Sequence, residues 1–189
     1  AQKSLQRFRA SNRYIKLILI MAKAIIQKAF KFRISNPSKI VRERLEQTLY
    51  LCRQLYNASL QERRDAYQIN RISINYQHQQ NQLPEIKVTN PEYKNIHSQV
   101  LQNVLKRCER AFDGFFRRIK AKQIAGFPRF KSASRYDSFC YPQSGFSLTG
   151  DKLTLSKIGK VKIKLSRSVV SKIKTCTIKK EIDKWFVIF

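Results

Sequence analysis

The stretch AGFPRFKSASRYDSF, residues 125–139, marks the point at which the sequence changes from one hydrophobic period to another. Upstream of it the apolar residues recur at helical spacing, and downstream they alternate as in strands. Gly126 and Pro128 prevent the stretch itself from continuing a helix. Its aromatic residues are interleaved with cations, and its one acid is Asp137. This composition predicts a nucleic-acid contact, a crossover that anchors helices to strands, or both.

The chain before this stretch predicts one strand followed by helices. Residues 24–34 alternate apolar and cationic side chains, which is typical of a half-buried strand with Lys31 and Arg33 on its outer face. Asn36 followed by Pro37 is a helix-start signal. We expect helices over residues 40–67, 73–83 and 96–122, with a loop over 84–95.

The chain after the stretch predicts a β-meander. Five short strand-like runs follow one another, and Gly150-Asp151 and Asp183-Lys184 are typical of hairpin turns. The simplest fold is α+β: a small, OB-like β-barrel with a helical lobe inserted after its first strand. We divide the chain into an N-terminal extension (1–22), the first strand (23–35), the helical lobe (36–124) and the rest of the barrel (125–189). Met21 begins a stretch typical of a natural start, so we expect residues 1–20 of the extension to be either non-native sequence or a poorly ordered arm.

The net charge predicts a polyanionic partner. The 189 residues include 39 Lys and Arg against 12 Asp and Glu, a formal charge of +27. Nucleic acid is the first candidate. An anionic membrane is the second, but the one candidate amphipathic helix, residues 5–26, is less basic than the tracts after Asp113, and no apolar run approaches the ~20 residues of a span. The four cysteines form no CxxC pair, which favours free thiols in the cytoplasm over a zinc site.

Catalytic motifs are not found in the sequence. The acids are scattered rather than grouped as a metal-dependent nuclease requires, and there is no Walker A run, HExxH or Ser-His-Asp candidate. We therefore expect no catalytic residue, cofactor, metal or small-molecule substrate in this chain.

Two patterns predict nucleic-acid contacts. Lys160, Lys162 and Lys164 share one face of a strand, about 6.6 Å apart at the usual rise, so a phosphate backbone could run along them. In the opening stretch, cations alternate with Phe127 and Phe130, which could stack on unpaired bases or could instead be core residues of the crossover.

A family resemblance rests on motifs in a fixed order. They are KAFKFRISNP, LCRQLYNASLQERRDAY, HSQVLQNVLKRCERAFDGFFRRIK, GFPRFKS, RYDSFCYP and LSKIGKVKIKL. Together these segments, between residues 23 and 189, resemble the N-terminal half of TnpB proteins, the OrfB-type transposon ("transposase") nucleases of prokaryotes related to type V CRISPR effectors.

The resemblance implies a wedge-type barrel interrupted by a helical recognition lobe, which is described in the family as a helix-turn-helix. It implies a guide RNA and target DNA as partners, with the guide–target heteroduplex held by these parts. The rings of the "YN" and "AF..FF" motifs are more often lobe core, and the arginines are the preferred contacts. Pattern and resemblance together nominate Lys31, Arg33, Arg53, Tyr56, Asn57, Arg107, Phe116, Arg117, Arg118, Phe127, Arg129, Phe130, Lys131, Arg135, Lys160, Lys162 and Lys164.

The family's RuvC nuclease, with its Mg²⁺ site, and its zinc ribbon would follow Phe189, so both metals are expected only there. The terminal run is apolar on both faces and predicts that the natural protein continues. Our leading hypothesis is a nucleic-acid-binding portion without catalysis. The alternatives are a fragment of a complete RNA-guided DNA endonuclease and a DNA-binding transposase accessory protein.

Overall fold

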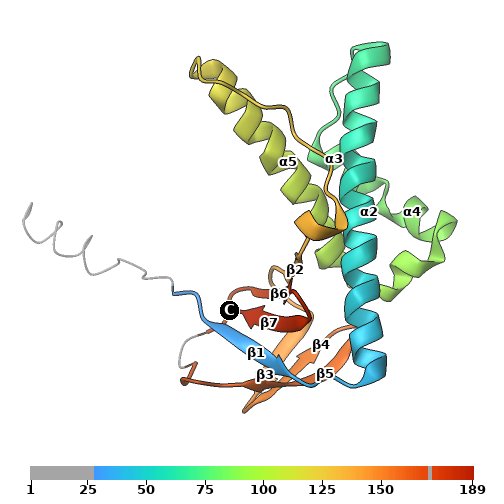
Figure 1. The fold of residues 1–189 in the computed structure, drawn as a ribbon. Coiled ribbons are helices and arrows are strands. Elements are labelled where there is room, and N and C mark those ends of the chain that lie inside the picture. The colour runs from blue at the N-terminus through green and yellow to red at the C-terminus, as the bar shows by residue number, and fades with distance from the viewer. Residues whose placement is uncertain (1–27, 170–171) are drawn as a thin grey trace, which may run out of the picture.

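The computed structural model describes residues 28–169 and 172–189, in which a helical lobe stands on a twisted sheet (Figure 1). The helices are α2 (Lys39–Asn70), α3 (Tyr76–Asn81), α4 (Leu83–Thr89) and α5 (Ser98–Lys120), with short 3-10 turns η1 (Pro91–Asn95) and η2 (Ala133–Arg135). The strands are β1 (Lys31–Ser35), β2 (Ser138–Tyr141), β3 (Phe146–Thr149), β4 (Lys152–Leu155), β5 (Gly159–Lys164), β6 (Cys176–Glu181) and β7 (Lys184–Ile188). The predicted extension 1–22 and the start of the predicted first strand lie outside the described residues.

The first strand of the chain lies in the middle of the sheet. The order is β2-β6-β7-β1-β5-β4-β3, with all neighbours antiparallel. Within β1, Arg33 lies opposite Lys164 of β5 on one side and Phe186 of β7 on the other. The chain therefore leaves the sheet after β1 and returns at β2, which confirms the α+β class and the helical insertion.

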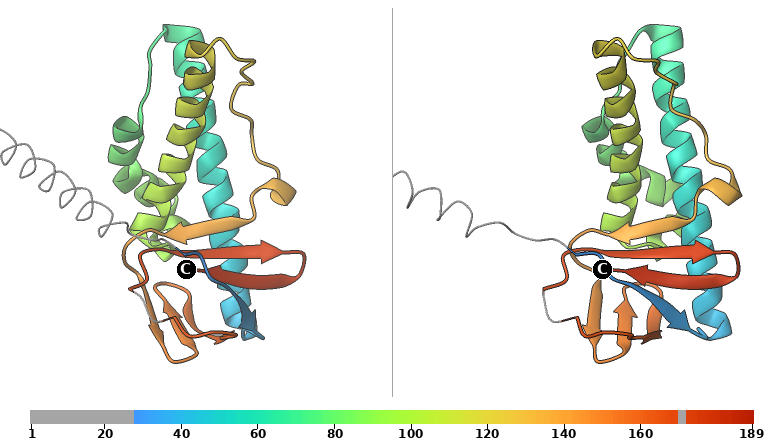
Figure 2. Two further views of the ribbon diagram at one scale, coloured as in Figure 1. Left: turned by 90° about the vertical axis from the view of Figure 1, so that its left-hand side faces the viewer. Right: turned by 60° about the vertical axis from the view of Figure 1, so that its left-hand side comes forward.

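The sheet is strongly twisted but open. Figure 2 shows the strands of its two ends running in very different directions. The edge strands β2 and β3 do not pair with each other, so the described strands curve around a core without closing into a barrel. A contact across the open side comes from Tyr141, whose hydroxyl donates to the carbonyl oxygen of Ser156 at 2.9 Å.

Alternation along the strands puts apolar side chains inside and cations outside. Phe32 and Ile34 of β1 and Val161 and Ile163 of β5 are buried, whereas the residues between them are exposed or half-exposed. The inner face packs on the lower parts of α2 and α5, where Leu45, Leu101 and Leu105 are fully buried. The predicted half-buried strands thus form one core with the helices.

The helical boundaries differ from the predictions at three places. α2 begins after Ser38, whose hydroxyl accepts from the N–H of Val41, and not at Asn36. The second predicted helix shortens to α3, which is capped by the side chain of Asn75. The predicted loop over 84–95 is wrong, because it holds α4 and η1. Its prolines, which suggested a loop, sit in the first turn of each, where a missing N–H costs nothing.

The cysteines are free and mostly buried, as predicted. Cys52, Cys108 and Cys176 are buried, and Cys140 is half-exposed. Burial raises the pKa of the Cys52 thiol to about 12, so it stays protonated and unreactive at neutral pH. In the part of the chain that the structure describes, no helix combines the length and apolar character needed to cross a bilayer.

The packing of α2 on the sheet gives a stability prediction. Leu45 is 0% exposed, whereas Ile40, on the same helix, is 62% exposed. Leu45→Ala should lower the free energy of unfolding by about 2–5 kcal/mol, because it leaves a cavity in the shared core. Ile40→Ala should change it by less than about 0.5 kcal/mol. Equal effects of the two substitutions in chemical denaturation would contradict this packing.

Candidate nucleic-acid interface

Residues 121–137, here called the strap, lead the chain from the end of α5 back to the sheet. Figures 1 and 2 show the strap running down the helical lobe from its tip to β2. Except for the single turn η2, the described strap has no helix or strand of its own. Its course must therefore be fixed by side chains of the helices.

Asn57 holds the middle of the strap. Its side-chain Nδ2 donates to the carbonyl oxygen of Lys131 at 3.0 Å, and its Oδ1 accepts from the Lys131 N–H at 2.8 Å. One amide thus satisfies both polar groups of one backbone residue, as a neighbouring strand would. The Lys131 side chain takes no part and stays half-exposed.

Tyr56 and Arg107 hold the lower end of the strap. Tyr56 is buried, and its ring centroid lies 6.0 Å from that of Tyr136. Arg107 donates through Nη1 to the carbonyl oxygen of Ser138 at 2.6 Å, and its guanidinium lies 5.9 Å from the Tyr136 ring centroid. Burial raises the pKa of the Tyr136 hydroxyl, so this group stays protonated and neutral at neutral pH.

Two phenylalanines of the strap are packed on one side and exposed on the other. The Phe127 ring lies edge-on to Phe112 and Phe115, with centroids 5.6 and 5.4 Å away. The Phe130 ring lies 5.4 Å from the guanidinium of Arg64. Phe127 is nevertheless 45% and Phe130 43% exposed. Each ring is thus both an anchor and an available stacking surface.

The cations of the strap and of the end of α5 have no acidic partner in the part of the chain that the structure describes. Arg117, Arg118, Arg129 and Arg135 are exposed, and none of them, nor Lys131, forms an ion pair within the described residues. The strap's one acid, Asp137, lies 3.5 Å from the ammonium of Lys179 on β6. This part of the surface is therefore positive and rigidly supported.

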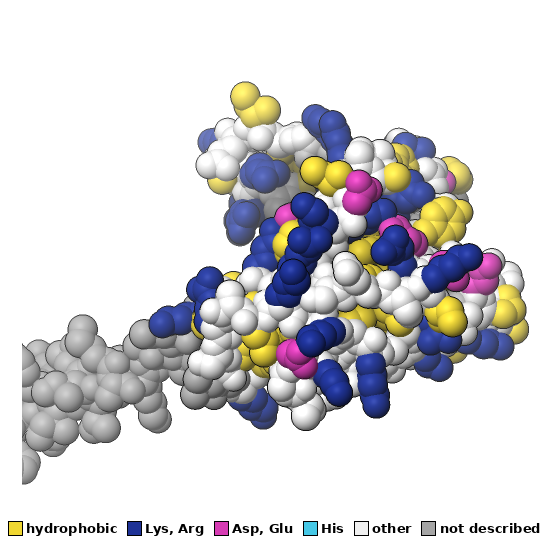
Figure 3. All heavy atoms as spheres, turned by 60° about the horizontal axis from the view of Figure 1, so that its bottom comes forward, with side chains coloured by type: hydrophobic (Ala, Val, Ile, Leu, Met, Phe, Trp, Pro, Cys, Tyr) yellow, Lys and Arg dark blue, Asp and Glu magenta, His cyan; other side chains and the backbone are white. Residues whose placement is uncertain are grey.

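The other group of predicted residues lies on the outer face of the sheet. Lys160, Lys162 and Lys164 are exposed along one side of β5, as predicted, and the strand register places Arg33 beside Lys164. Lys162 pairs with Asp151 at 3.2 Å. Figure 3 shows that Lys and Arg dominate the charged side chains on the underside of the protein.

Two predicted residues have other partners. The ammonium of Lys31 pairs with Glu181 at 2.6 Å and lies 4.2 Å from the Phe186 ring centroid. Arg53 is half-buried on α2, with its guanidinium 5.4 Å from the Tyr50 ring centroid. The Lys31–Glu181 contact is a surface ion pair of the kind that a phosphate can replace at small cost.

Sequence reasoning missed a buried arginine next to the strap. Arg63 donates through Nε to Gln79 at 2.8 Å and through Nη1 to Glu109 of α5. The sequence signal that predicts its burial is helical spacing: Arg63 follows the buried Ser59 by four residues and the buried Tyr56 by seven, so it shares their face of α2. In the described part of the chain, no three His, Cys, Asp or Glu side chains lie close enough together to hold a metal ion.

Two comparisons with known proteins bear on the family of the chain. Residues 21–71 match the family model described as the helix-turn-helix domain of IS605-type OrfB proteins. InsQ of Escherichia coli (strain K12), named as a candidate RNA-guided DNA endonuclease, is 31% identical over 164 residues, which cover 85% of this chain and 39% of InsQ. The chain belongs to the TnpB/OrfB family. This confirms the resemblance seen in the motifs, and the chain spans about two fifths of the length of this relative.

The region that matches the helix-turn-helix model has its own geometry in this TnpB/OrfB protein. Its described residues form β1 and then one continuous 32-residue helix, α2, closed by Arg71 in the left-handed conformation. A groove-reading helix-turn-helix needs a second helix after a short turn. The strap and the outer face of the sheet, rather than that motif, are therefore the candidate binding surfaces of this TnpB/OrfB chain.

The clamp formed by Asn57 can be tested by hydrogen exchange. Asn57→Ala should reduce stability by about 1–2 kcal/mol, because two hydrogen bonds are lost and water can partly replace them. The amide of Lys131 should then exchange about tenfold faster or more, while amides of α2 keep their protection. Gln54→Ala, on the exposed side of the same helix, is the matched control. Unchanged exchange at Lys131 in Asn57→Ala would show that the strap is fixed by other contacts.

Proposed function

We propose that this chain is the nucleic-acid-binding portion of a TnpB-like protein and that it binds a guide RNA and the heteroduplex of that RNA with target DNA. The proposal rests on the strap. Asn57 of α2 fixes its backbone, while its cations have no ion pair among the described residues and its Phe127 and Phe130 rings stay half-exposed. The name of InsQ supports RNA and DNA as partners.

The strap suits an unpaired or partly paired strand. Arg129, Lys131 and Arg135 contact phosphates in this proposal, while Phe127 and Phe130 offer their exposed faces to bases. Because the strap backbone is already fixed in the free protein, little conformational entropy is lost when a strand binds. Arg117 and Arg118 extend the positive surface along the end of α5.

The outer face of the sheet suits a phosphate backbone. Arg33, Lys160, Lys162 and Lys164, with Lys31 at one side, form rows of charge across β1 and β5. Neutralisation of phosphates by such rows releases counterions, which makes binding depend steeply on salt. Tyr56, Asn57 and Arg107 act in this proposal by positioning the strap, and Arg53 and Phe116 lie where they can add contacts.

DNA cleavage, the activity in the name of InsQ, is a separate proposal. It would belong to a RuvC-type nuclease domain of a complete protein, and Mg²⁺ and Zn²⁺ would be bound there and not by the described residues. Reading the gene past the Phe189 codon tests this directly. A second candidate, a DNA-binding accessory protein, is favoured by the helix-turn-helix match and predicts duplex DNA as the preferred ligand.

The proposal predicts a steep salt dependence. If about six phosphates are neutralised, the logarithm of the binding constant should fall against the logarithm of salt concentration with a slope near −5 on a heteroduplex. Arg129→Ala combined with Lys131→Ala should reduce this slope by about 1.5–2 and leave the melting temperature nearly unchanged.

The matched control is Lys39→Ala with Lys94→Ala, which removes two exposed cations away from the strap. Fluorescence anisotropy at several salt concentrations, with single-stranded RNA, heteroduplex and duplex DNA as ligands, measures the salt slope of the binding constant for each variant. A flat salt response, or tighter binding of duplex DNA than of RNA ligands, would contradict the proposal.

A further inference from the structure

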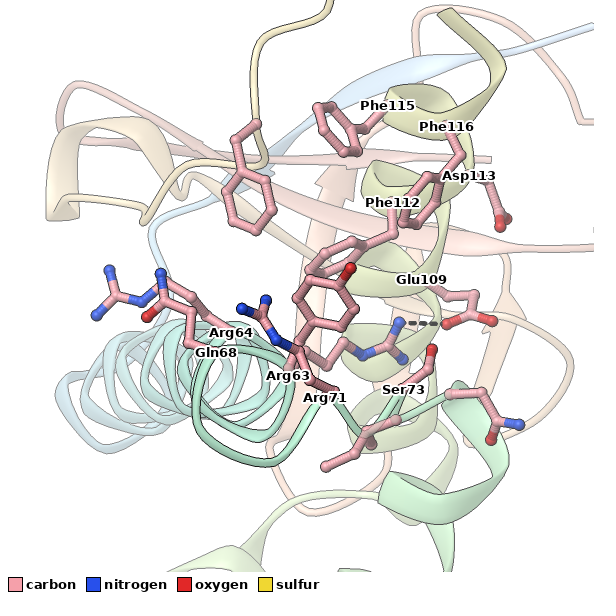
Figure 4. A pocket seen from close by; sticks show the side chains of 14 residues that line it. Arg63, Arg64, Gln68, Arg71, Ser73, Glu109, Phe112, Asp113, Phe115 and Phe116 are labelled. Atoms are coloured by element: carbon pink, nitrogen blue, oxygen red, sulfur yellow. Dashed lines mark hydrogen bonds and ion pairs between the residues drawn. The ribbon is translucent and has the colours of Figure 1, made fainter. Parts of the chain in front are cut away.

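A cleft opens between the distal halves of α2 and α5, at the tip of the helical lobe (Figure 4). Its volume is about 600 Å³, within the range of small-molecule sites. We propose that this cleft binds one unpaired nucleobase of the nucleic acid. The inference rests on the nucleic-acid binding proposed above and adds a site to it.

One wall of the cleft is aromatic. Phe112, Phe115 and Phe116 extend from α5 (Figure 4). Phe127 of the strap packs against the first two. The Phe112 and Phe116 rings are stacked, with centroids 6.4 Å apart, and Phe116 remains 59% exposed. Tyr67 of α2, also exposed, lines the cleft with them. The stacked Phe112 and Phe116 rings, of which Phe116 is largely exposed, provide an apolar ring face on which any base can stack.

A buried donor lines the same cleft. Arg63 is only 6% exposed, and two of its nitrogens are bonded to Gln79 and Glu109. Its third nitrogen, Nη2, is buried without a hydrogen-bond partner among the described residues. An unsatisfied buried guanidinium N–H is costly, and a ring nitrogen or carbonyl oxygen of a base would satisfy it.

The charges inside the cleft favour a base over a phosphate. Glu109 and Asp113 both line it, and carboxylates repel a phosphate but accept hydrogen bonds from the amino groups of bases. Cations lie around the cleft: the Arg71 guanidinium is 5.5 Å from the Tyr67 ring centroid, and Arg64 lines the cleft beside Gln68. These arginines suit the phosphates on either side of an inserted base.

The cleft is continuous with the strap surface. A neighbouring hollow of about 340 Å³ is lined by Phe127, Arg129 and Phe130 of the strap together with Leu60 and Arg64 of α2. Phe127 and Arg64 therefore belong to both spaces. A strand held at the strap by Arg129 therefore lies next to the cleft, and one of its bases can enter the cleft without a second binding path.

The test compares intact and abasic single strands of equal length, as RNA and as DNA. Abasic strands keep every phosphate but have no base to insert. Phe116→Ala should weaken binding of the intact strand at least about 5-fold, the lower end of the effect of one lost stack, and change binding of the abasic strand less than about 2-fold. Tyr67→Ala should behave in the same way. The RNA and DNA arms show which strand supplies the base.

The matched control is Ile119→Ala, because Ile119 lies one turn from Phe116 on α5, is 50% exposed and does not line the cleft. It should weaken neither strand. Equal losses for intact and abasic strands, or equal losses in Phe116→Ala and Ile119→Ala, would overturn the nucleobase site. Salt-dependent binding of the intact strand by the unmodified protein would still support the proposed function in that case, whereas no binding at all would refute the proposed function itself.

Discussion

The pairing of β1 with both β5 and β7 is the constraint on which the rest of the structure depends. The backbone groups of Phe30 and Phe189 exchange two hydrogen bonds, at 3.0 and 2.9 Å, so the start and the end of the described chain are joined in the centre of the sheet. Everything between β1 and β2 must then leave the sheet and return to it. The strap is the segment that returns along the lobe of two long helices. Apart from the turn η2 it forms no helix or strand, so side chains of the helices must hydrogen-bond its backbone groups.

The same side chains that solve this structural problem prepare a binding surface. Asn57 takes both polar groups of the Lys131 backbone, and Arg107 takes the carbonyl of Ser138, so the strap is fixed without using the charges of its own cations. A segment that is rigid yet keeps its cations free is what electrostatic binding of a strand requires. Asn57 and Arg107 therefore position the strap, whereas the cations of the strap itself stay available for contacts with nucleic acid.

The few acids of the sheet region pair with only some of the cations. Glu46, Asp137, Asp151 and Glu181 pair with lysines of β1, β5 and β6. The strap and the end of α5, by contrast, keep seven cations without an ion pair among the described residues. On the outer face of the sheet, Lys31 and Lys162 are thus paired with acids, whereas Arg33, Lys160 and Lys164 have no ion pair among the described residues.

The sequence by itself determined the α+β class, the insertion of the helices after the first strand, the alternation that exposes Lys160, Lys162 and Lys164, and the family. These are local properties: period, turn chemistry and motif order are all written within short windows of sequence. It misassigned residues 84–95, because Pro84 and Pro91 are equally compatible with a loop and with a helix start. Only the tertiary structure decided that the sheet stays open, that Asn57 meets Lys131 across 74 positions, and that Arg63, Phe116 and Phe127 line one cleft. Those facts depend on which surfaces meet after folding, and contacts between distant segments leave no periodic trace in one sequence.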